Sequence, residues 1–385
     1  MKITHLCLGA FYVDNHSYQE NVIPKYHKKM GHDVSIIAST LSFDMNGNAT
    51  HVEARKYLNE NNIRVNRLNY NPLYPKSVAK FLRLYSGTYK AIEETQPDII
   101  FIHGCQFLDI TEIVRYIKKN PKVIVYIDNH ADFSNSATNW LSKNILHKVL
   151  WRSMAKMMEP YTKMYYGVLP ARVDFLTDIY KIPKEKVELL PLGVDDDEVN
   201  KLKIDFDREQ YRKKYNVTSK EFLIVSGGKI DNSKKQILLL MAAIKKINSS
   251  KIKLIVFGSI IPELKEDIDN LIDNDRIIFV GWLNNEEIYK LLASSELAVY
   301  PGRHSVLWEQ TVGIGIPMIV KYWPGTTHID VGGNVEFIYE DSVENIIQIL
   351  DWIFLDSNYQ NMKEVAENKG IREFSYEKIS EKSIT

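Results

Sequence analysis

Short apolar runs alternate with longer stretches of helical periodicity along most of the chain. In the first half, the apolar runs predict strands at Ile3–Ala10, Asp33–Ala38, Ile63–Leu68, Asp98–Ile102, Lys122–Ile127 and Met164–Leu169. The stretches between them predict helices at Tyr18–Met30, Val78–Glu94, Leu108–Lys118 and Trp140–Met158. Because strand, helix and strand follow one another within short distances, the strands are expected to pair in parallel.

A second alternating series follows a region rich in turn residues between Ile182 and about Asp205. After a charged helix, Asp207–Tyr215, strands are predicted at Phe222–Ser226, Lys253–Phe257, Ile277–Val280, Leu297–Tyr300 and Met318–Lys321. Helices are predicted at Lys235–Ile247, Ile261–Ile272, Asn285–Ala293 and Trp308–Gly315, with a helical region from Val343 onward. The pattern predicts two doubly wound α/β domains, residues 1–193 and 194–365, followed by a C-terminal segment, 366–385.

Composition narrows the class of protein without naming a ligand. The chain has 385 residues, of which 45% are hydrophobic and 25% charged, and its formal net charge is zero. This balance gives no bulk attraction to nucleic acid, so we expect no nucleic-acid partner. Cys7 and Cys105 lie in or beside apolar runs and are expected to be buried free thiols. Free thiols suit the reducing cytoplasm better than export, so we expect a cytoplasmic protein. No signal peptide and no apolar stretch of about 20 residues is recognisable, so we expect a soluble or at most peripheral protein.

The segment from Tyr300 to Pro317 carries the densest group of candidate functional residues. Arg303, His304 and Glu309 follow an apolar strand and stand near the start of the next helix. A helix N-terminus has unpaired N–H groups that attract anionic ligands. The segment therefore suggests a site for a polar ligand that carries phosphate, although a polar loop that caps a core helix would read the same way.

A glycine-rich loop follows the first strand of the second series. Gly228 permits close approach of the backbone, and Lys229 and Lys234 are spaced to converge on a diphosphate. The loop matches neither a Walker A motif nor a dinucleotide fingerprint. Gly258 and Gly281 end neighbouring strands and could frame a nucleotide base. The alternative is a solvated lysine-rich surface.

The first half has two further candidates. His130 lies between Asp128 and Asp132 after a buried strand, which is typical of a polar catalytic cluster but also of an ordinary turn. The loop from Ala10 to Gln19 mixes aromatic and hydrogen-bonding side chains suited to sugars, or to a solvated surface. In the second half, the loop with Thr326, Thr327, His328 and Asp330 is expected at the same mouth as Glu309.

Together these motifs resemble those of retaining family 4 glycosyltransferases of the GT-B fold, over nearly the whole chain. Gly228–Lys234 resembles the G-[RK]-x-x-x-x-K motif, and Leu190–Asp195 resembles the P-N-G-V-D junction, with Leu192 in place of Asn. The family's central motif contains two glutamates and ends in G-x-P. Gly315-Ile316-Pro317 fits that ending, and either Glu309 or Gln310 takes the place of the second glutamate. The runs P-G-R-H-S and W-E-Q resemble a bacterial polysaccharide-building branch.

The resemblance implies two Rossmann-like domains facing across a cleft, with the helix Tyr376–Lys382 returning to the first. It implies retaining transfer of a hexosyl or N-acetylhexosaminyl group from a nucleotide-diphospho-sugar, with UDP the expected nucleotide, to a saccharide or lipid-linked acceptor. No metal and no cofactor is implied. The catalytic residues would be His130, Glu309 and Lys234. The donor site would comprise Gly228, Lys229, Lys234, Gly258, Arg303, His304, Glu309, Gln310 and Thr311. The acceptor site would comprise Tyr12, Asp14, His16, Tyr18 and Asp132.

Other functions remain open at this stage. A nucleotide-sugar epimerase of the same fold would use the same donor without an acceptor, and a non-catalytic GT-B partner protein would keep only the fold. An NAD-dependent oxidoreductase is disfavoured because the glycine fingerprint is missing. The helices Lys76–Lys90 and Lys143–Lys163 are basic and aromatic and could contact the inner membrane face, or simply be packed on one side and solvated on the other.

Overall fold

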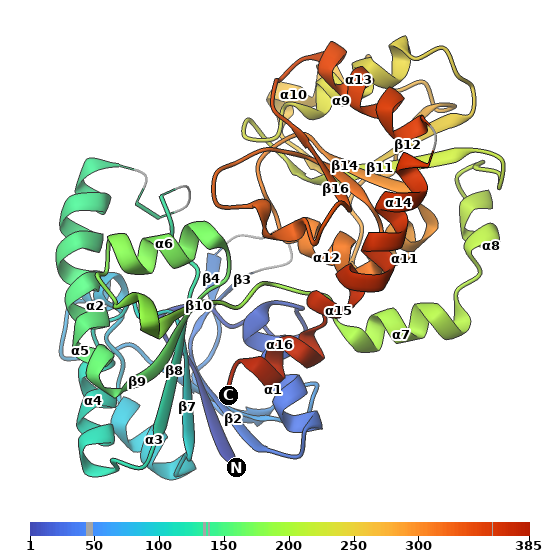
Figure 1. Ribbon diagram of the computed structural model, residues 1–385. Helices are drawn as coiled ribbons and strands as arrows, with labels where there is room; N and C mark the ends of the chain where they lie inside the picture. The colour runs from blue at the N-terminus through green and yellow to red at the C-terminus, as the bar shows by residue number, and fades with distance from the viewer. Residues whose placement is uncertain (44–48, 134–135, 138, 356) are drawn as a thin grey trace. The chain divides into compact units, whose positions relative to one another are not determined.

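The computed structural model describes residues 1–43, 49–133, 136–137, 139–355 and 357–385. The chain packs into two compact units, Met1–Pro191 with Ile379–Thr385, and Leu192–Lys378. Each unit is built on its own sheet with helices on both faces (Figure 1). The predicted α/β class with two Rossmann-like halves is confirmed. The last seven residues pack with the first unit although they follow the second in sequence.

The first unit contains an eight-stranded sheet in the order β10-β9-β8-β7-β1-β2-β6-β5. Every neighbouring pair is parallel except the edge pair β5 and β6. The strands are β1 (Lys2–Cys7), β2 (Asp33–Ser39), β5 (Lys56–Leu58), β6 (Arg64–Leu68), β7 (Ile99–His103), β8 (Ile124–Asn129), β9 (Thr162–Gly167) and β10 (Val187–Leu189). A separate antiparallel pair is formed by β3 (Leu41–Phe43) and β4 (Ala49–His51).

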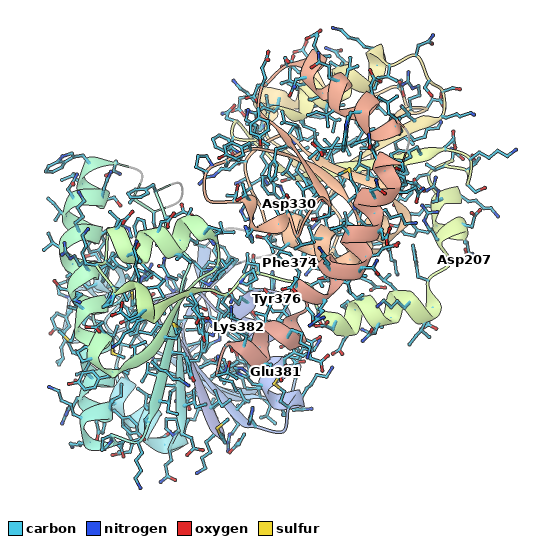
Figure 2. The ribbon with its side chains drawn as sticks, viewed as in Figure 1. Asp207, Asp330, Phe374, Tyr376, Glu381 and Lys382 are labelled. Atoms are coloured by element: carbon cyan, nitrogen blue, oxygen red, sulfur yellow. The ribbon has the colours of Figure 1, made fainter. Side chains whose placement is uncertain are left out.

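The helices of the first unit connect these strands. They are α1 (Gln19–Lys29), α2 (Lys76–Leu82), α3 (Thr88–Thr95), α4 (Ile110–Lys119), η1 (Ser142–Trp151), α5 (Arg152–Met158), η2 (Glu159–Tyr161), α6 (Pro170–Asp178) and η3 (Lys184–Lys186). The final helix, α16 (Tyr376–Lys382), lies where Figure 2 labels Tyr376, Glu381 and Lys382. The hydroxyl of Tyr166 donates to the Lys382 carbonyl at 3.2 Å, so the end of α16 is fixed to β9.

The second unit contains a six-stranded, fully parallel sheet in the order β13-β12-β11-β14-β15-β16. The strands are β11 (Phe222–Ile230), β12 (Ile252–Ile260), β13 (Ile277–Phe279), β14 (Leu297–Tyr300), β15 (Met318–Lys321) and β16 (Val335–Ile338). The helices are α7 (Asp196–Asp205), α8 (Arg208–Lys213), α9 (Ile237–Lys246), α10 (Pro262–Asp269), α11 (Asn285–Ser294), α12 (Leu307–Ile314), η4 (Thr327–Ile329), α13 (Val343–Phe354), α14 (Asn358–Val365), η5 (Ala366–Gly370) and α15 (Ile371–Glu373).

Both faces of this second sheet are buried. Successive side chains of one strand point to opposite faces, so each strand contributes to two cores. In β11, Ile224 packs with Leu240 of α9 on one face. Its neighbour Val225 packs on the other face with the core that contains Leu291 and Trp308. This two-sided burial explains why the strands appear in the sequence as continuous apolar runs.

Several predicted elements were wrong in extent. The predicted helix Val78–Glu94 is two helices, α2 and α3, because Arg83 and Gly87 adopt left-handed conformations between them. The predicted helix Trp140–Met158 has the expected extent, but its central part, η1, is a π-helix that α5 continues. Several short elements were not predicted from the pattern, namely β3, β4, β5, β10, β16 and α6.

Candidate active site

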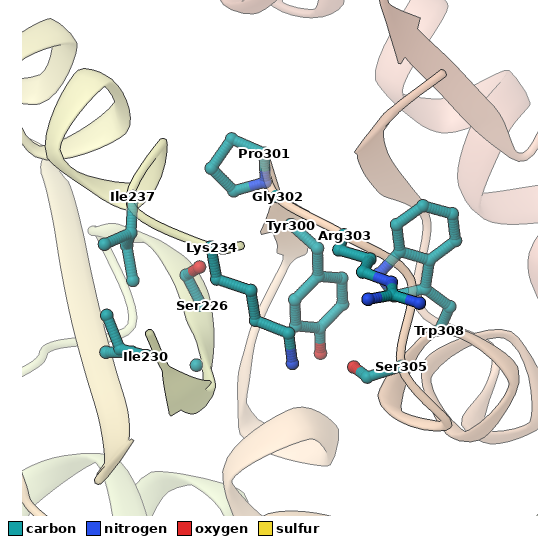
Figure 3. Close-up of a pocket in the computed structure, with 11 residues that line it drawn as sticks. Ser226, Ile230, Lys234, Ile237, Tyr300, Pro301, Gly302, Arg303, Ser305 and Trp308 are labelled. Carbon is teal, nitrogen blue, oxygen red and sulfur yellow. The ribbon is translucent and has the colours of Figure 1, made fainter. Parts of the chain in front are cut away.

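A hollow lies beyond the carboxyl ends of β11 and β14 in the second unit (Figure 3). These strands are parallel neighbours, with Val225 opposite Ala298, so the loops that follow them meet at one edge of the sheet. The hollow has a volume of about 290 Å³, part of it continuous with solvent. Its walls are formed by Ser226, Gly227, Ile230, Lys234, Ile237, Tyr300, Pro301, Gly302, Arg303, Ser305 and Trp308.

Two cations line this hollow, Lys234 from the loop after β11 and Arg303 from the loop after β14. Burial lowers the pKa of Lys234, and although Asp231 raises it, the charges of Arg303 and Lys229 lower it further. Within the part of the chain that the structure describes, neither Lys234 nor Arg303 has an ion pair or a side-chain hydrogen bond. Two like charges without a direct ion pair form a site that an anion stabilises.

Glycines allow the backbone to come close to these cations. Gly228 and Gly258 face each other in the β11–β12 register, with φ of +110° and +120°. A Cβ at Gly258 would lie 1.8 Å from the Gly228 carbonyl oxygen, and a Cβ at Gly228 would lie 3.5 Å from Lys234 Nζ. A Cβ at Gly302 would lie 2.7 Å from Lys234 Cα. At Gly258 and Gly302 a side chain would clash with neighbouring backbone, so glycine at these two positions allows the loops to pack closely beside Lys234.

Glu309 forms a second cluster in the first half of α12. Its Oε1 accepts hydrogen bonds from His304 Nε2 at 2.8 Å and from His328 Nε2 at 2.9 Å. Burial raises the pKa of Glu309, but the charges and hydrogen bonds of the two imidazoles outweigh burial and hold this pKa below its usual range. Oε2 of Glu309 and Nδ1 of His328 are buried without a partner among the described residues. The cluster is therefore an ionised carboxylate with hydrogen-bonding capacity left over.

The predicted donor residues occupy different depths. Gly228, Lys234, Gly258 and Arg303 lie at or directly beside the hollow, and Lys229 is an exposed residue of β11. His304 keeps 11% of its side-chain surface, whereas Glu309 keeps none.

Gln310 and Thr311 are also buried in α12. The Thr311 hydroxyl donates to the Leu307 carbonyl at 2.6 Å and contacts the Tyr300 hydroxyl at 2.9 Å, so its hydrogen-bonding capacity is used inside the protein.

His130 lies in the first unit, directly after β8. Its Nε2 is 3.5 Å from Asp128 Oδ1 and 4.0 Å from Glu20 Oε1. Burial lowers the pKa of His130, but the two carboxylates outweigh burial and raise it. Asp128 is fully buried, and its Oδ2 is 2.7 Å from Nδ1 of His103. The buried Asp128 carboxylate thus favours the cationic form of the His130 imidazole.

The predicted acceptor residues fall into two groups. Tyr12 is buried, and its hydroxyl accepts from Asn59 Nδ2 at 2.9 Å, while Asp14 pairs with the buried Arg67 at 3.0 Å. These contacts serve the interior of the unit.

His16 and Tyr18, in contrast, are exposed and stack with ring centroids 5.3 Å apart. Asp132 is buried and accepts from Arg172 Nε at 3.0 Å. Of the acceptor residues, only His16 and Tyr18 present side chains freely to solvent.

Some residues that the structure brings to these sites were not predicted from the sequence. Ser226, Tyr300, Ser305 and Trp308 line the hollow but were not assigned to it. Ser305 and Trp308 stand in the P-G-R-H-S and W-E-Q runs, which was the available signal. His103 is the partner of Asp128. The only feature of the sequence that points to it is its position, as a polar residue at the end of an apolar strand.

Comparison with domain families matches both halves of the chain. Residues 25–198 match the family Glycosyltransferase Family 4, and residues 207–369 match the family Glycosyl transferases group 1. Both halves carry glycosyltransferase domains. This supports a glycosyltransferase, an enzyme of class EC 2.4. No curated protein sequence matches the chain.

Similar solved structures span the chain from end to end. A glycosyltransferase from Rickettsia africae is 17% identical, with a TM-score of 0.69 over 99% of this chain and 96% of its own. The Anabaena protein HepE, solved in complex with UDP, is 13% identical, with a TM-score of 0.69 over 99% and 98%. A UDP-GlcNAc 2-epimerase from Neisseria meningitidis, bound to UDP-GlcNAc, is 13% identical, with a TM-score of 0.64 over 100% and 99%. At these identities the likeness shows the GT-B fold.

Neither a membrane-spanning helix nor a metal-binding cluster is present among the described residues. No helix there has the length and apolar character needed to cross a bilayer. No group of three His, Cys, Asp or Glu side chains in the same residues could hold a metal ion.

Proposed function

We propose that the protein transfers a hexosyl or N-acetylhexosaminyl group from a UDP-sugar to a hydroxyl of a glycan or lipid-linked saccharide, with retention and without a metal ion. The observation that carries the proposal is the pair of half-buried cations, Lys234 and Arg303, that line one hollow with no ion pair among the described residues. A diphosphate supplies the missing negative charge. The UDP complex of HepE, a protein of the same fold, supports the choice of nucleotide.

The chemistry of the proposal follows from charge. Breaking the bond between the sugar and the diphosphate places negative charge on the leaving oxygen, and Lys234 and Arg303 stabilise that charge as a metal ion would. The buried Glu309 carboxylate orients the ring of His304. His304 keeps more exposed surface than Glu309 or His328, and we assign it to the donor hydroxyls. We assign to His130 a hydrogen bond to the transferred sugar, and to His16 and Tyr18 contacts to the acceptor. The acceptor proton passes to the leaving diphosphate oxygen on the same face of the sugar.

The first experiment is a thermal-stability screen of the full chain with UDP, GDP, ADP and their common sugars. A ligand present at 100 times its dissociation constant stabilises the folded state by about 2.7 kcal/mol. We expect UDP and one UDP-sugar to stabilise the wild type and the variant Lys235→Ala, since Lys235 is the exposed neighbour of Lys234. Lys234→Ala and Arg303→Ala should lose this stabilisation. Retention of UDP binding by both would remove the basis of the proposal.

Turnover then separates transferase from epimerase. Incubation of the stabilising UDP-sugar with mixed saccharide acceptors should release UDP only when an acceptor is present, and the product should keep the anomeric configuration of the donor. Conversion of the UDP-sugar to its epimer without acceptor would make the protein an epimerase instead. The presence of a chelator should leave the rate unchanged.

We further propose that the first unit contacts an anionic membrane surface, where a lipid-linked acceptor would be found. Leu141, Ile145 and Val149 follow one another at every fourth residue before and along η1, with 63%, 53% and 59% exposure. Exposed lysines, Lys148 and Lys156, accompany this apolar face on η1 and α5. An apolar face with basic residues is the composition that binds the interface of an anionic bilayer.

Vesicle sedimentation tests this surface. The wild type should bind vesicles that contain phosphatidylglycerol and bind pure phosphatidylcholine weakly. The double substitution Ile145→Ser with Val149→Ser should reduce binding about tenfold, because two apolar side chains are lost from the interface. Leu355→Ser, which removes a side chain of similar exposure, 58%, in the second unit, is the matched control. Equal binding of the double variant and the control would exclude η1 as the contact.

A further inference from the structure

A continuous chain of close polar contacts crosses the interior of the first unit. Asp128 Oδ2 is 2.7 Å from His103 Nδ1, His103 Nε2 is 3.1 Å from His5 Nδ1, and His5 Nε2 is 3.0 Å from His27 Nδ1. The four side chains have no exposed surface. Every ring nitrogen faces a partner, so each contact has to be completed by a hydrogen atom.

The far end of the chain is in α16. Nε2 of His27 is 3.0 Å from the carbonyl oxygen of Ser380 and 3.1 Å from Ser383 Oγ. The hydroxyl of Ser383 already donates to the Ser380 carbonyl, at 2.8 Å. Both oxygens therefore accept from His27, and Nε2 of His27 carries a hydrogen. The contacts thus begin and end on acceptors, because the other end is the Asp128 carboxylate.

The number of hydrogens needed exceeds the number that neutral rings supply. Four contacts, from Asp128 through His103, His5 and His27 to Ser380, need four hydrogens. Each neutral imidazole carries one N–H, so the three rings supply three. With only three hydrogens, two lone pairs would face each other at one buried contact, a costly arrangement. One additional proton completes the set.

We propose that this histidine chain (Asp128, His103, His5 and His27) holds one proton beyond those of its neutral rings, and that this proton resides on His103. His103 and Asp128 thereby act as positioning residues that set the charge and orientation of His130. His103 is the ring in contact with a carboxylate. His5 and His27 lack one, and burial lowers the pKa of His5 and lowers that of His27 to about 4. The role of His130 in sugar transfer rests on the proposed function, whereas the proton count does not.

The coupling to His130 passes through the two oxygens of Asp128. Oδ2 contacts His103, while Oδ1 accepts from the Gly104 N–H at 3.1 Å and lies 3.5 Å from His130 Nε2. A positive His103 neutralises part of the carboxylate charge that His130 would otherwise sense. The other titratable or charged groups that act on the chain or on His130 are Glu20, Arg172, His32, Cys7 and Cys105. Burial raises the pKa of both thiols, which keeps them neutral.

The direct test is nuclear magnetic resonance of the full chain with ¹⁵N-labelled histidine, assigned with single substitutions. At about pH 8, where a free histidine is neutral, we expect His103 to show two protonated ring nitrogens and His5 and His27 to show one each. Three neutral rings at that pH would overturn the proposal. This measurement needs only the wild type to fold and makes no use of turnover.

A matched pair of variants at His27 tests the counting argument. In His27→Gln the amide can donate to the Ser380 carbonyl and accept from His5, so four hydrogens are still needed and His103 should stay charged. In His27→Phe two contacts are removed, and the two left, Asp128 to His103 and His103 to His5, are completed by two neutral rings. His103 should then become neutral at about pH 8. A charged His103 in the phenylalanine variant would contradict the count.

The same pair tests the coupling to His130. Loss of the charge on His103 should raise the titration midpoint of His130 by about one pH unit in His27→Phe and leave it unchanged in His27→Gln. In the pH profile of UDP-sugar turnover, the limb that is governed by the ionisation of His130 should shift in the same direction as the His130 midpoint. A neutral His103 without any change in the His130 midpoint would overturn the positioning role. A protein that transfers no sugar would refute the proposed function, while the resonance data would still decide the proton count.

Discussion

Glu309 is a carboxylate without exposed surface, and its Oε1 accepts hydrogen bonds from two imidazoles. Removing such a partner leaves the imidazoles buried and unpaired. We therefore expect Glu309→Ala to destabilise the second unit by about 3 kcal/mol and to reduce turnover, whereas Glu309→Gln, which keeps an acceptor, should cost about 1 kcal/mol. Urea unfolding and the rate of UDP release measure the two effects. Glu340→Gln, at an exposed position, is the control, and an alanine variant as stable as the wild type would contradict the assigned contacts.

The burial of Glu309 shows what the sequence could supply at the scale of single residues. Its place near the start of a helix and its neighbours Arg303 and His304 were apparent from spacing alone. Its second partner, His328, lies 19 residues later and reaches it only because β14 and β15 are parallel neighbours. Contacts of that kind are set by packing between elements, so pattern analysis found the cluster but could not predict that its carboxylate is inaccessible.

His147 gives the first unit a sensitivity to acid. Its Nδ1 lies 2.9 Å from the Tyr180 hydroxyl, and burial lowers its pKa to about 4. The unfolded chain, with a histidine pKa of about 6.5, binds more protons between those values, so stability is full above about pH 6.5 and is lost as pH falls toward about 4.

The substitution His147→Gln keeps an acceptor for Tyr180 but cannot titrate. The wild type should lose about 2 kcal/mol at this site between about pH 7 and about pH 5, and the variant should not. Denaturant unfolding at both pH values, with the exposed His16→Gln as control, measures the difference. An equal loss of stability in all three proteins would assign the acid sensitivity to other groups.

At the scale of elements, the junction of β11 and β12 depends on glycine. Gly258 and Gly281 both have positive φ, but a Cβ at Gly258 would lie 1.8 Å from the Gly228 carbonyl, whereas a Cβ at Gly281 would meet no atom within 4 Å. Alanine at either position carries the cost of a left-handed backbone, about 1–2 kcal/mol. Only Gly258→Ala adds a clash with backbone.

We therefore expect Gly258→Ala to lower the thermal midpoint well beyond Gly281→Ala and to abolish stabilisation by UDP, because the Gly228 backbone beside Lys234 is displaced. The Gly281 variant should retain UDP binding. Calorimetric melting of both variants with and without UDP makes the comparison. Similar midpoints for the two would mean that the strands separate at little cost, against the close pairing described above.

Strands and helices were predicted correctly where apolar runs were long. The prediction failed where a left-handed residue or pairing with a neighbouring strand determines the local structure. The main parallel strands and most helices were located because burial on both faces leaves continuous apolar runs. The break between α2 and α3 rests on the left-handed Arg83, which no propensity favours. The short edge strand β5 owes its existence to pairing with β6, since its three residues are only half buried or exposed.

At the scale of the whole molecule, the chain passes between the two units twice, at Pro191–Leu192 and at Lys378–Ile379. The return of the last residues to the first unit followed from family resemblance and not from any pattern in the sequence of α16. The physical reason for the return is visible only in the contacts. Buried polar groups of β8, β9 and α1, namely the hydroxyls of Tyr126 and Tyr166 and Nε2 of His27, find their acceptors in the terminal segment.

Deletion of residues 379–385 tests this dependence. The hydroxyl of Tyr126 loses the Ile384 carbonyl, at 2.9 Å, and His27 loses both of its acceptors, so the first unit should be destabilised by about 3 kcal/mol or more. Deletion of Thr385 alone removes an exposed residue and should change little. Hydrogen exchange should report faster exchange in β7 and β8 of the longer deletion.

The binding of UDP provides the counter-test, because its proposed site lies wholly in the second unit. If each unit is stabilised by its own core, the longer deletion should retain UDP-dependent protection of residues 226–237 and 300–308 while β7 and β8 exchange faster. Loss of both together would mean that the two cores unfold as one cooperative system. Retention of wild-type exchange in β7 and β8 would mean that Tyr126, Tyr166 and His27 find water or other partners at no cost, which their burial argues against.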